Sequence, residues 1–450
     1  MRLSDYSQPG GRGLFRRDRR LFDQRGTFTF TIPDGVTKVW AFSMGAGGGA
    51  SVMDGTGIGM IGGGKGGGYA SGIISGLTPG NTLTLTVGSG GVGEHANAGT
   101  SATAGGNSTV VGGSTTYLQG NGGGAGAGHT TSDPGDQKGQ GGSSSTNNVT
   151  DSYTAAGGGS GSWFIPEEAS GSSDSISTSC RFATGGGASG SPFGTGMGGG
   201  KPVGLARAAT GGGGWTQRDF EHSKWVIDGG DLTSAVPNSS MEIGLPGYGS
   251  HTPPQFFYMG TSFRLRTIVR GGNGRTAKGK SSVKPYVWGG EATDNGTSGW
   301  NDNYPIDTLL NFHSYVDGED GNPHWWFPWE IDGGGGAGIG IAASTTGISG
   351  RMWVGGDGGA GAGGGGIFMD GQFTSSDNTN SASILIGGNG GFGAGGGGSF
   401  MYITDSDQDK DQSAVGGNGG NGGGGGGARA VGADTSVGGN GGDGCIGIYW

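Results

Sequence analysis

Several ordinary features of globular proteins are scarce in this chain of 450 residues. It has two cysteines, Cys180 and Cys445, and no C-x-x-C pair, which excludes a disulfide framework and a cysteine-based metal site. No stretch approaches the length of apolar sequence that spans a membrane, and the first thirty residues lack the apolar core of a secretory signal. We therefore expect neither a membrane span nor a signal peptide.

Charge is also scarce and unevenly distributed. Charged residues make up 13 % of the chain, against about 25 % in an ordinary globular protein. The net charge of −10 argues against nucleic acid as a general partner. Residues 1–26 are the exception, with seven arginines and three aspartates. This segment is either a disordered tail or an arm that docks onto a partner, and the residues we expect to dock are Arg12, Phe15, Arg16, Arg17, Arg19 and Arg20.

What the chain does have is glycine, at 119 of 450 residues, where about 7 % is usual. Glycine buries almost no apolar area and loses the most backbone entropy on ordering. Such a chain either stays disordered or is stabilised mainly by backbone hydrogen bonds. Its aromatic share of 9 % and its β-patterned segments are unlike those of disordered sequences. We therefore predict an ordered fold of an unconventional kind.

Regular β-patterns occur at both ends of the chain. From Gly26, Phe28, Phe30 and Ile32 alternate with threonines, which is typical of a half-buried strand. Four further strand-like segments occur, and we expect the last of them to pair with an early strand and close a small β-sandwich. These segments are 36–43, 69–74, 83–87 and 445–450.

The long middle alternates between glycine tracts and aromatic, polar loops. The run Gly-Gly-Asn-Gly recurs at irregular spacing, which excludes a solenoid of fixed period. An ordered glycine tract in the polyproline-II conformation points its backbone groups in three directions. Neighbouring tracts can then satisfy one another's hydrogen bonds in a polyglycine-II lattice.

These patterns predict a mostly β and irregular fold with almost no α-helix. We expect a small β-sandwich closed by the N- and C-terminal strands, a polyglycine-II helix lattice, and long surface loops. The expected division of the chain is an Arg-rich docking arm at 1–26, a sandwich at 27–90 plus 445–450, and a glycine-rich domain at 91–444 with aromatic loops at 215–270 and 281–332.

The two long loops are the densest in aromatic residues. Eight of the eleven tryptophans lie between residues 163 and 329. Each aromatic residue belongs either to a small core within its loop or to a contact surface. The stretch 324–329 is too bulky for all its members to be buried. Our candidates for contact with a receptor are Phe256, Phe257, Tyr258, Trp300, Tyr304, His324, Trp325, Trp326 and Trp329.

Signals for catalysis are weak. Residues 274–281 match the phosphate-loop pattern, but no helix start follows, and we interpret the match as coincidence. Residues 438–446 resemble one calcium β-roll nonapeptide without a second copy in register. The acidic turn at 317–322 lacks the full calcium-loop pattern. We expect no enzyme activity, no metal and no cofactor.

The two ends of the chain resemble the glycine-rich domain of bacteriophage tail-fibre and tail-tip proteins. The segments that carry the resemblance are FTIPDGVTKVWAFSMGAGGG, GGGKGGGYASGIISGLTPGNTLTLTVGSGG and GGNGGDGCIGIYW. The alternation of glycine motifs with aromatic loops is also similar to the tip adhesins of long tail fibres. In that family a polyglycine-II sandwich presents loops to a receptor on the host surface. The long loops at 215–332 exceed the family's usual short variable segments.

The resemblance implies a phage tail adhesin, a receptor-binding virion protein made in the host cytoplasm and acting outside it. Its partners would be other tail proteins, through the N-terminal arm, and a host outer-membrane protein or polysaccharide. A homo-oligomer is left open. The alternative is a structural component of the tail, baseplate or fibre that buries its aromatic loops against neighbouring subunits. An ice-binding protein would need an ordered array of surface threonines, and the interleaved charged loops disfavour it. A cell-envelope depolymerase is left open, since it would need a cleft with paired acids, which a sequence does not display.

Overall fold

The computed structural model consists of strands and extended glycine tracts. Its only helix among the described residues is the 3₁₀ turn η2, Ala96–Ala98. The structure describes residues 18–54, 59–130, 141–159, 181–192, 194–196, 198–199, 207–209, 211–215, 243–244, 256–257, 266–267, 285–288, 312–314, 338–343, 352–358, 361, 363–371, 383–403, 412–431 and 435–450.

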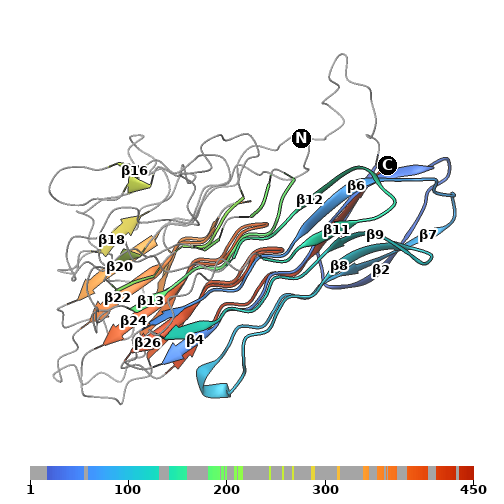
Figure 1. The fold of residues 1–450 in the computed structure, drawn as a ribbon. Coiled ribbons are helices and arrows are strands. Elements are labelled where there is room, and N and C mark those ends of the chain that lie inside the picture. Colours follow the sequence, from blue (N-terminus) through green and yellow to red (C-terminus); the bar gives the residue numbers. More distant parts are fainter. Residues whose placement is uncertain are drawn as a thin grey trace, which may run out of the picture.

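Two five-stranded antiparallel sheets form a sandwich at one end of the molecule, on the right in Figure 1. The first sheet has the order β1 (Arg19–Phe22), β28 (Cys445–Tyr449), β3 (Lys38–Met44), β6 (Tyr69–Ser75) and β12 (Thr150–Ala155). The second has the order β11 (Ser144–Thr146), β9 (Thr115–Gly120), β8 (Ser108–Gly112), β7 (Thr82–Val87) and β2 (Gly26–Thr31).

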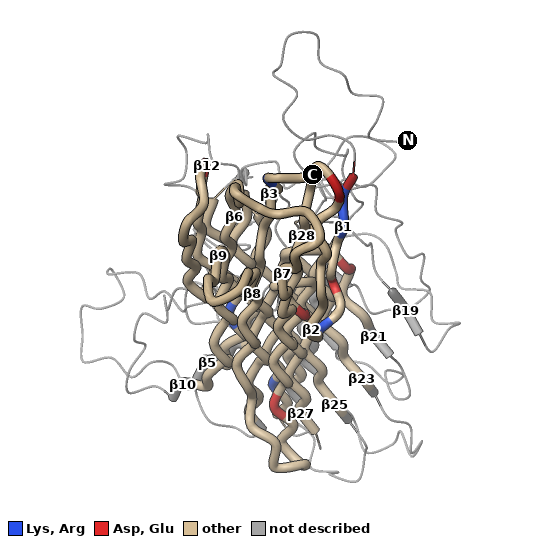
Figure 2. The backbone as a smooth tube through the Cα atoms, turned by 90° about the vertical axis from the view of Figure 1, so that its right-hand side faces the viewer, with Lys and Arg blue, Asp and Glu red and all other residues tan. Residues whose placement is uncertain are grey.

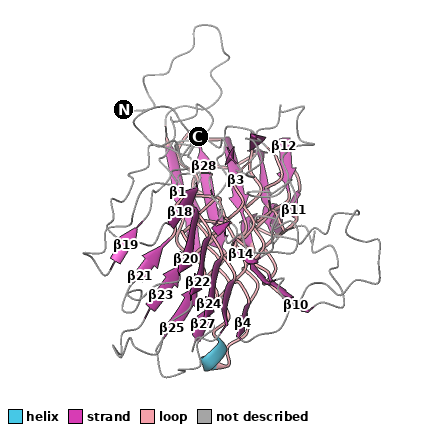
Figure 3. Cartoon of the chain, turned by 90° about the vertical axis from the view of Figure 1, so that its left-hand side faces the viewer, coloured by secondary structure: helices cyan, strands magenta, loops and turns pink. Residues whose placement is uncertain are grey.

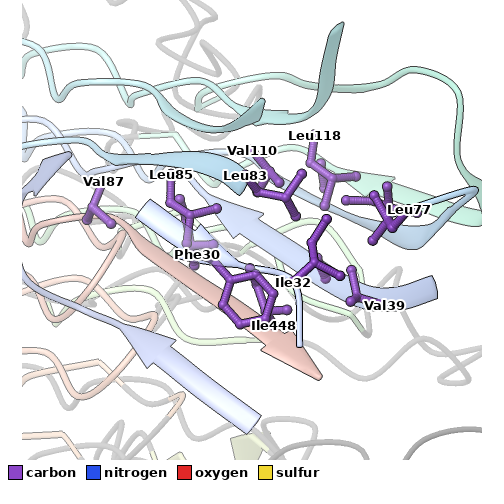
Figure 4. Close-up of a cluster of buried hydrophobic side chains, with 14 residues drawn as sticks. Phe30, Ile32, Val39, Leu77, Leu83, Leu85, Val87, Val110, Leu118 and Ile448 are labelled. Carbon is purple, nitrogen blue, oxygen red and sulfur yellow. The ribbon is translucent and has the colours of Figure 1, made fainter. Parts of the chain in front are cut away.

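The predicted closure of the sandwich by the chain termini is confirmed. β28 lies between β1 and β3 and pairs antiparallel with both. The inward-facing residues of the two sheets form one buried apolar cluster, in which Phe30, Leu85 and Ile448 meet (Figure 4). The alternation of apolar and threonine residues in the β2 segment therefore marks the buried face, because successive side chains of a strand point to opposite faces.

The sandwich is larger than the predicted 27–90 plus 445–450. It also contains β8, β9, β11 and β12, which the expected division assigned to the glycine-rich domain. These strands are rich in serine and threonine and contribute few apolar residues, of which Val110, Leu118 and Ala155 are buried. The sandwich also begins earlier, since β1 falls inside the expected arm at 1–26. The RRLF sequence of β1 does not alternate between apolar and polar residues, so the alternation typical of a strand begins only at Gly26.

Extended glycine tracts run from the sandwich through the middle of the molecule (Figure 1). Along residues 45–50, successive backbone N–H groups bond to three different neighbouring tracts in turn. The N–H groups of Gly45 and Gly48 donate to Gly68 and Lys65, at 2.8 and 2.9 Å. The N–H groups of Ala46 and Gly49 donate to Gly106 and Thr103. Those of Gly47 and Ala50 donate to Gly442 and Gly439. This three-residue period is that of a polyglycine-II lattice, as predicted.

Close packing of backbone on backbone explains the glycine content of the lattice. A Cβ atom at Gly47 would overlap the carbonyl of Gly423, and one at Gly49 would overlap that of Val92. Side chains are therefore excluded from most lattice positions by the neighbouring tracts themselves.

A twelve-residue glycine motif repeats in register through the C-terminal half. It occupies 355–366, 387–398 and 416–427, and its first part recurs at 438–444. The seventh position is a glycine with positive φ, at 76° in Gly361, 80° in Gly393 and 75° in Gly422. Each of these glycines turns the chain back, and a side chain would be strained there. The tracts are thus regular, and the irregular spacing noted in the sequence comes from the segments between them.

Three small sheets form the opposite end of the molecule, which we call the tip (Figure 3). One has the order β18 (Pro285–Trp288), β20 (Gly338–Ala343), β22 (Ile367–Gly371), β24 (Ser399–Ile403), β26 (Ala428–Val431) and β4 (Val52–Asp54). The second contains β19 (Phe312–Ser314), β21 (Met352–Val354), β23 (Ser383–Ile386), β25 (Gln412–Val415) and β27 (Thr435–Val437). The third contains β10 (Gly128–Thr130), β5 (Gly59–Ile61), β13 (Arg181–Ala183), β14 (Arg207–Ala209) and β15 (Ile243–Gly244). Most neighbouring tip strands are parallel, because each motif returns to the tip beside the previous one.

Candidate binding surfaces

The tip strands bracket the segments that carry most of the predicted receptor-binding residues. β18 joins its sheet beside β20, and β19 joins its sheet beside β21. The segment 289–311 therefore begins and ends at tip strands, and so does 315–337, which runs from β19 to β20. The first segment contains Trp300 and Tyr304, and the second contains His324, Trp325, Trp326 and Trp329.

These six residues and Tyr258 lie outside the described residues, so their roles remain predictions. Phe256 and Phe257 form strand β16, Phe256–Phe257, which pairs antiparallel with β17, Arg266–Thr267. The structure therefore places these two candidates in the backbone of a short two-stranded sheet.

A buried cation lies in the core of the tip. Arg429 on β26 is fully buried, and its guanidinium carbon lies 5.8 Å from the centre of the Phe400 ring on the neighbouring strand β24. Phe400 packs with Ala183, Ala209 and Val431. A cation over an aromatic face is stabilised by the charge distribution of the ring. This contact could not be predicted from the sequence, because Arg429 comes just after a glycine run and has no neighbouring pattern that indicates burial.

Of the six predicted docking residues, Arg19 and Arg20 are described. Both lie on β1 and are exposed. Their pairing partners are Tyr449 and Ile448, whose side chains lie on opposite faces of the sheet. The two arginines therefore point to opposite sides of the strand. Arg12, Phe15, Arg16 and Arg17 lie outside the described residues.

An aromatic row crosses the outer face of the first sheet of the sandwich. Successive ring centres are 6.5 Å apart from Tyr153 to Tyr69, 5.8 Å from Tyr69 to Phe42, 5.9 Å from Phe42 to Trp40 and 5.1 Å from Trp40 to Tyr449. Phe42 and Tyr69 are buried, whereas the other three rings are half-buried. A Cβ at Gly447 would overlap the Phe42 ring, so the ring packs directly on the backbone of this glycine.

Phe42 and Tyr69 belong to a second buried cluster that includes Ala188 and Trp215, and Trp40, Tyr153 and Tyr449 pack against it with part of each ring exposed. Sequence reasoning missed this cluster. Burial raises the pKa of the Tyr69 hydroxyl far above its ordinary value. Burial also raises the pKa of Tyr449, an effect that the Arg19 guanidinium opposes. Both phenols are therefore neutral at physiological pH. The strands that carry Trp40, Phe42 and Tyr69 also carry apolar residues on their opposite face, which form the sandwich core. Aromatic residues on the second face of such strands were the signal that could have indicated the row.

Trp215, at the start of the predicted loop 215–270, is a packing residue. It is buried, and its ring lies against Gly393 and edge-on to Phe392, with centres 5.7 Å apart. Its indole N–H donates to Ser189 Oγ at 2.9 Å. This tryptophan joins the start of the loop to one of the repeated motifs.

The oxygen atoms of the segment that resembles a calcium β-roll are engaged in the lattice. Asn440 Oδ1 accepts a hydrogen bond from the Gly93 N–H, and Asp443 Oδ1 accepts one from Gly90. No group of three or more metal-ligating side chains occurs among the described residues. The phosphate-loop match at 274–281 and the acidic turn at 317–322 lie outside that part of the chain. Among the described residues, no helix has the length and apolar character needed to cross a membrane.

A family model described as a glycine-rich domain matches residues 23–231. The match covers most of the sandwich and the first part of the lattice. No curated protein matches the chain.

Proposed function

We propose that this protein is a phage tail adhesin that binds a receptor on the host bacterial surface through the segments at its tip. The observation that carries the proposal is the separation of the molecule into two ends. The sandwich holds both described ends of the chain, Asp18 and Trp450, which exchange backbone hydrogen bonds. The aromatic segments 289–311 and 315–337 are attached at the far end of the lattice.

This division suits an adhesin because a rigid scaffold can hold variable loops away from the point of attachment. The lattice is stabilised by backbone hydrogen bonds, so loop sequences can change without altering the scaffold. The family match supports the glycine-rich character of the chain, and the phage identity rests on the resemblance of its two ends to tail-fibre proteins.

The test is binding of the purified full chain to intact bacteria that a phage carrying it infects. We expect saturable binding, competition with phage adsorption, and retention by either the outer-membrane or the polysaccharide fraction. A folded protein that neither binds these cells nor slows adsorption would contradict the proposal.

One observation favours the alternative of a structural tail component. The half-buried rings of Trp40, Tyr153 and Tyr449 lie on the sandwich, away from the tip, and aromatic residues of this kind are common in protein interfaces. Substituting Trp40 should weaken assembly into the tail if that surface contacts a neighbouring subunit, and should leave cell binding unchanged.

A further inference from the structure

β1 forms an open edge of the sandwich. It is the terminal strand of the first sheet, with β28 on one side and no strand of the described residues on the other. Figure 2 shows β1 at the border of the sandwich beside β28, with its arginines in blue. An edge strand presents backbone donors and acceptors with which another extended chain can pair.

The hydrogen-bond pattern shows which residues of β1 face outward. The N–H of Asp18 donates to the carbonyl of Trp450 at 3.3 Å, and the N–H of Trp450 donates to Asp18 at 3.1 Å. Antiparallel strands alternate such bonded pairs with non-bonded pairs. In this register the next hydrogen-bonded pairs are Arg20 with Ile448 and Phe22 with Ile446. The backbone groups of Arg19 and Leu21 consequently point away from β28, and no further backbone hydrogen bond of either residue occurs in the described part of the chain.

The side chains along this edge indicate the chemistry of a partner. Arg19 and Arg20 are exposed on opposite faces, and Leu21 is 37 % exposed. Four more arginines precede them, at positions 2, 12, 16 and 17. Asp18 and Asp23 flank the strand. A second copy of β1 paired antiparallel with Arg20 at the centre would place the two Arg20 side chains opposite each other, which is unfavourable across neighbouring strands. A strand with carboxylates would instead place opposite charges beside both arginines.

We propose that β1 is a docking edge onto which an extended, acidic strand of another protein adds, exchanging backbone hydrogen bonds with Arg19 and Leu21. The partner's carboxylates lie beside Arg19 and Arg20. Strand addition of this type obtains affinity from main-chain bonds and specificity from alternate side chains. That the partner is a tail protein rests on the proposed function, whereas the strand addition itself does not.

Leu21→Pro tests the edge directly. The Leu21 N–H points outward, so proline removes a bond to an added strand and retains those between β1 and β28. Proline is tolerated on the open side of edge strands. Leu21→Val is the matched control, because it changes the side chain and keeps the N–H. Circular dichroism and the urea midpoint establish that both variants fold.

The probes are two fluorescent synthetic peptides, one repeating Glu-Glu-Val-Val and the other repeating Lys-Lys-Val-Val, so that an added strand carries charged side chains on both faces. We expect the acidic peptide to bind the full chain saturably and the basic peptide not to bind. Leu21→Pro should weaken acidic binding at least about tenfold, which corresponds to about 1.4 kcal/mol, and Leu21→Val should not. Arg19→Glu should reduce acidic binding and permit basic binding.

The proposal would be overturned if the acidic peptide did not bind the full chain, or if it bound the wild type and Leu21→Pro equally. Self-association of the wild type that Leu21→Pro abolishes would also overturn it, since the edge would then pair two copies of the chain. Because no cells are used, these outcomes are independent of whether the tip binds a host receptor.

Discussion

At the scale of the residue, most lattice glycines are required by the space around them. Gly123 and Gly124 are adjacent in sequence but differ in surroundings. A Cβ at Gly123 would overlap the Lys65 carbonyl, whereas one at Gly124 would meet only the Lys65 side chain, at 3.4 Å from Cδ. Backbone cannot yield as a flexible side chain can, so the two positions should tolerate alanine very differently.

We expect Gly123→Ala to lower the free energy of unfolding by about 3 kcal/mol, from overpacking and displaced hydrogen bonds. Gly124→Ala should change it by less than about 1 kcal/mol. Urea denaturation followed by tryptophan fluorescence measures both. Equal effects would mean that the backbone contact at Gly123 is not a tight one.

Ionisation of the buried phenol of Tyr69 should make stability depend on alkaline pH. Burial raises the folded-state pKa of Tyr69, so the folded protein keeps a proton that the unfolded chain releases above about pH 10. The stabilising contribution is full below that pH and is lost as the pH rises further.

Tyr69→Phe removes the ionisable group and keeps the ring. We therefore expect the urea midpoint of the wild type to fall more steeply than that of Tyr69→Phe between about pH 9 and 11. If the urea midpoints of the two proteins fall in parallel with pH, Tyr69 does not contribute to the loss of stability at alkaline pH.

At the scale of the element, a ladder of side chains fixes the register of the repeated motifs. Asn389 Oδ1 accepts from the Asn418 N–H, Asn418 Oδ1 accepts from Asn440, and Asn440 Oδ1 accepts from Gly93, each at 2.9 Å. Asp357 accepts from Asn389 in the same way. The recurrent Gly-Gly-Asn-Gly run of the sequence is thus explained: its amide oxygen caps the next tract.

Asn418→Ala should cost about 1 kcal/mol and speed hydrogen exchange at Asn440, whose donor loses its acceptor. Asn418→Asp keeps an acceptor, as Asp357 provides one in the native protein. This variant should therefore retain most of the stability and most of the protection of the Asn440 amide. Exchange at Asn440 that is unchanged in the alanine variant would show that the ladder does not hold this amide.

Sequence patterns located some elements well and others not at all. The alternation around Phe30 and the apolar face of 445–449 predicted strands at the sandwich core, and the composition predicted the lattice. The tip sheets escaped prediction because strands such as β21 and β27 have only three residues before a glycine tract, too few to show a period. The alignment of successive motifs depends on contacts such as the Asn418 ladder, which join residues distant in sequence. The candidate receptor residues came from aromatic density alone. The aromatic row on the sandwich was missed because its five rings lie on four strands that are distant in sequence.

At the scale of the whole molecule, we propose different roles for the two ends. The sandwich joins both described ends of the chain and carries the docking edge at β1, and the tip carries the attachment points of the aromatic segments. Two tryptophan sites therefore separate the roles. Trp325 and Trp326 belong to the segment attached at the tip, and the half-buried Trp40 lies on the sandwich.

The most direct measurement compares binding of Trp325→Ala, Trp326→Ala and Trp40→Ala proteins to intact host bacteria, with folding checked by circular dichroism. We predict that each tip substitution abolishes cell binding, because truncating an aromatic anchor at the centre of an interface removes much of its binding energy. Trp40→Ala should bind as the wild type does. Normal binding by both tip variants, or loss of binding by Trp40→Ala alone, would contradict the assignment of the tip as the receptor-binding end.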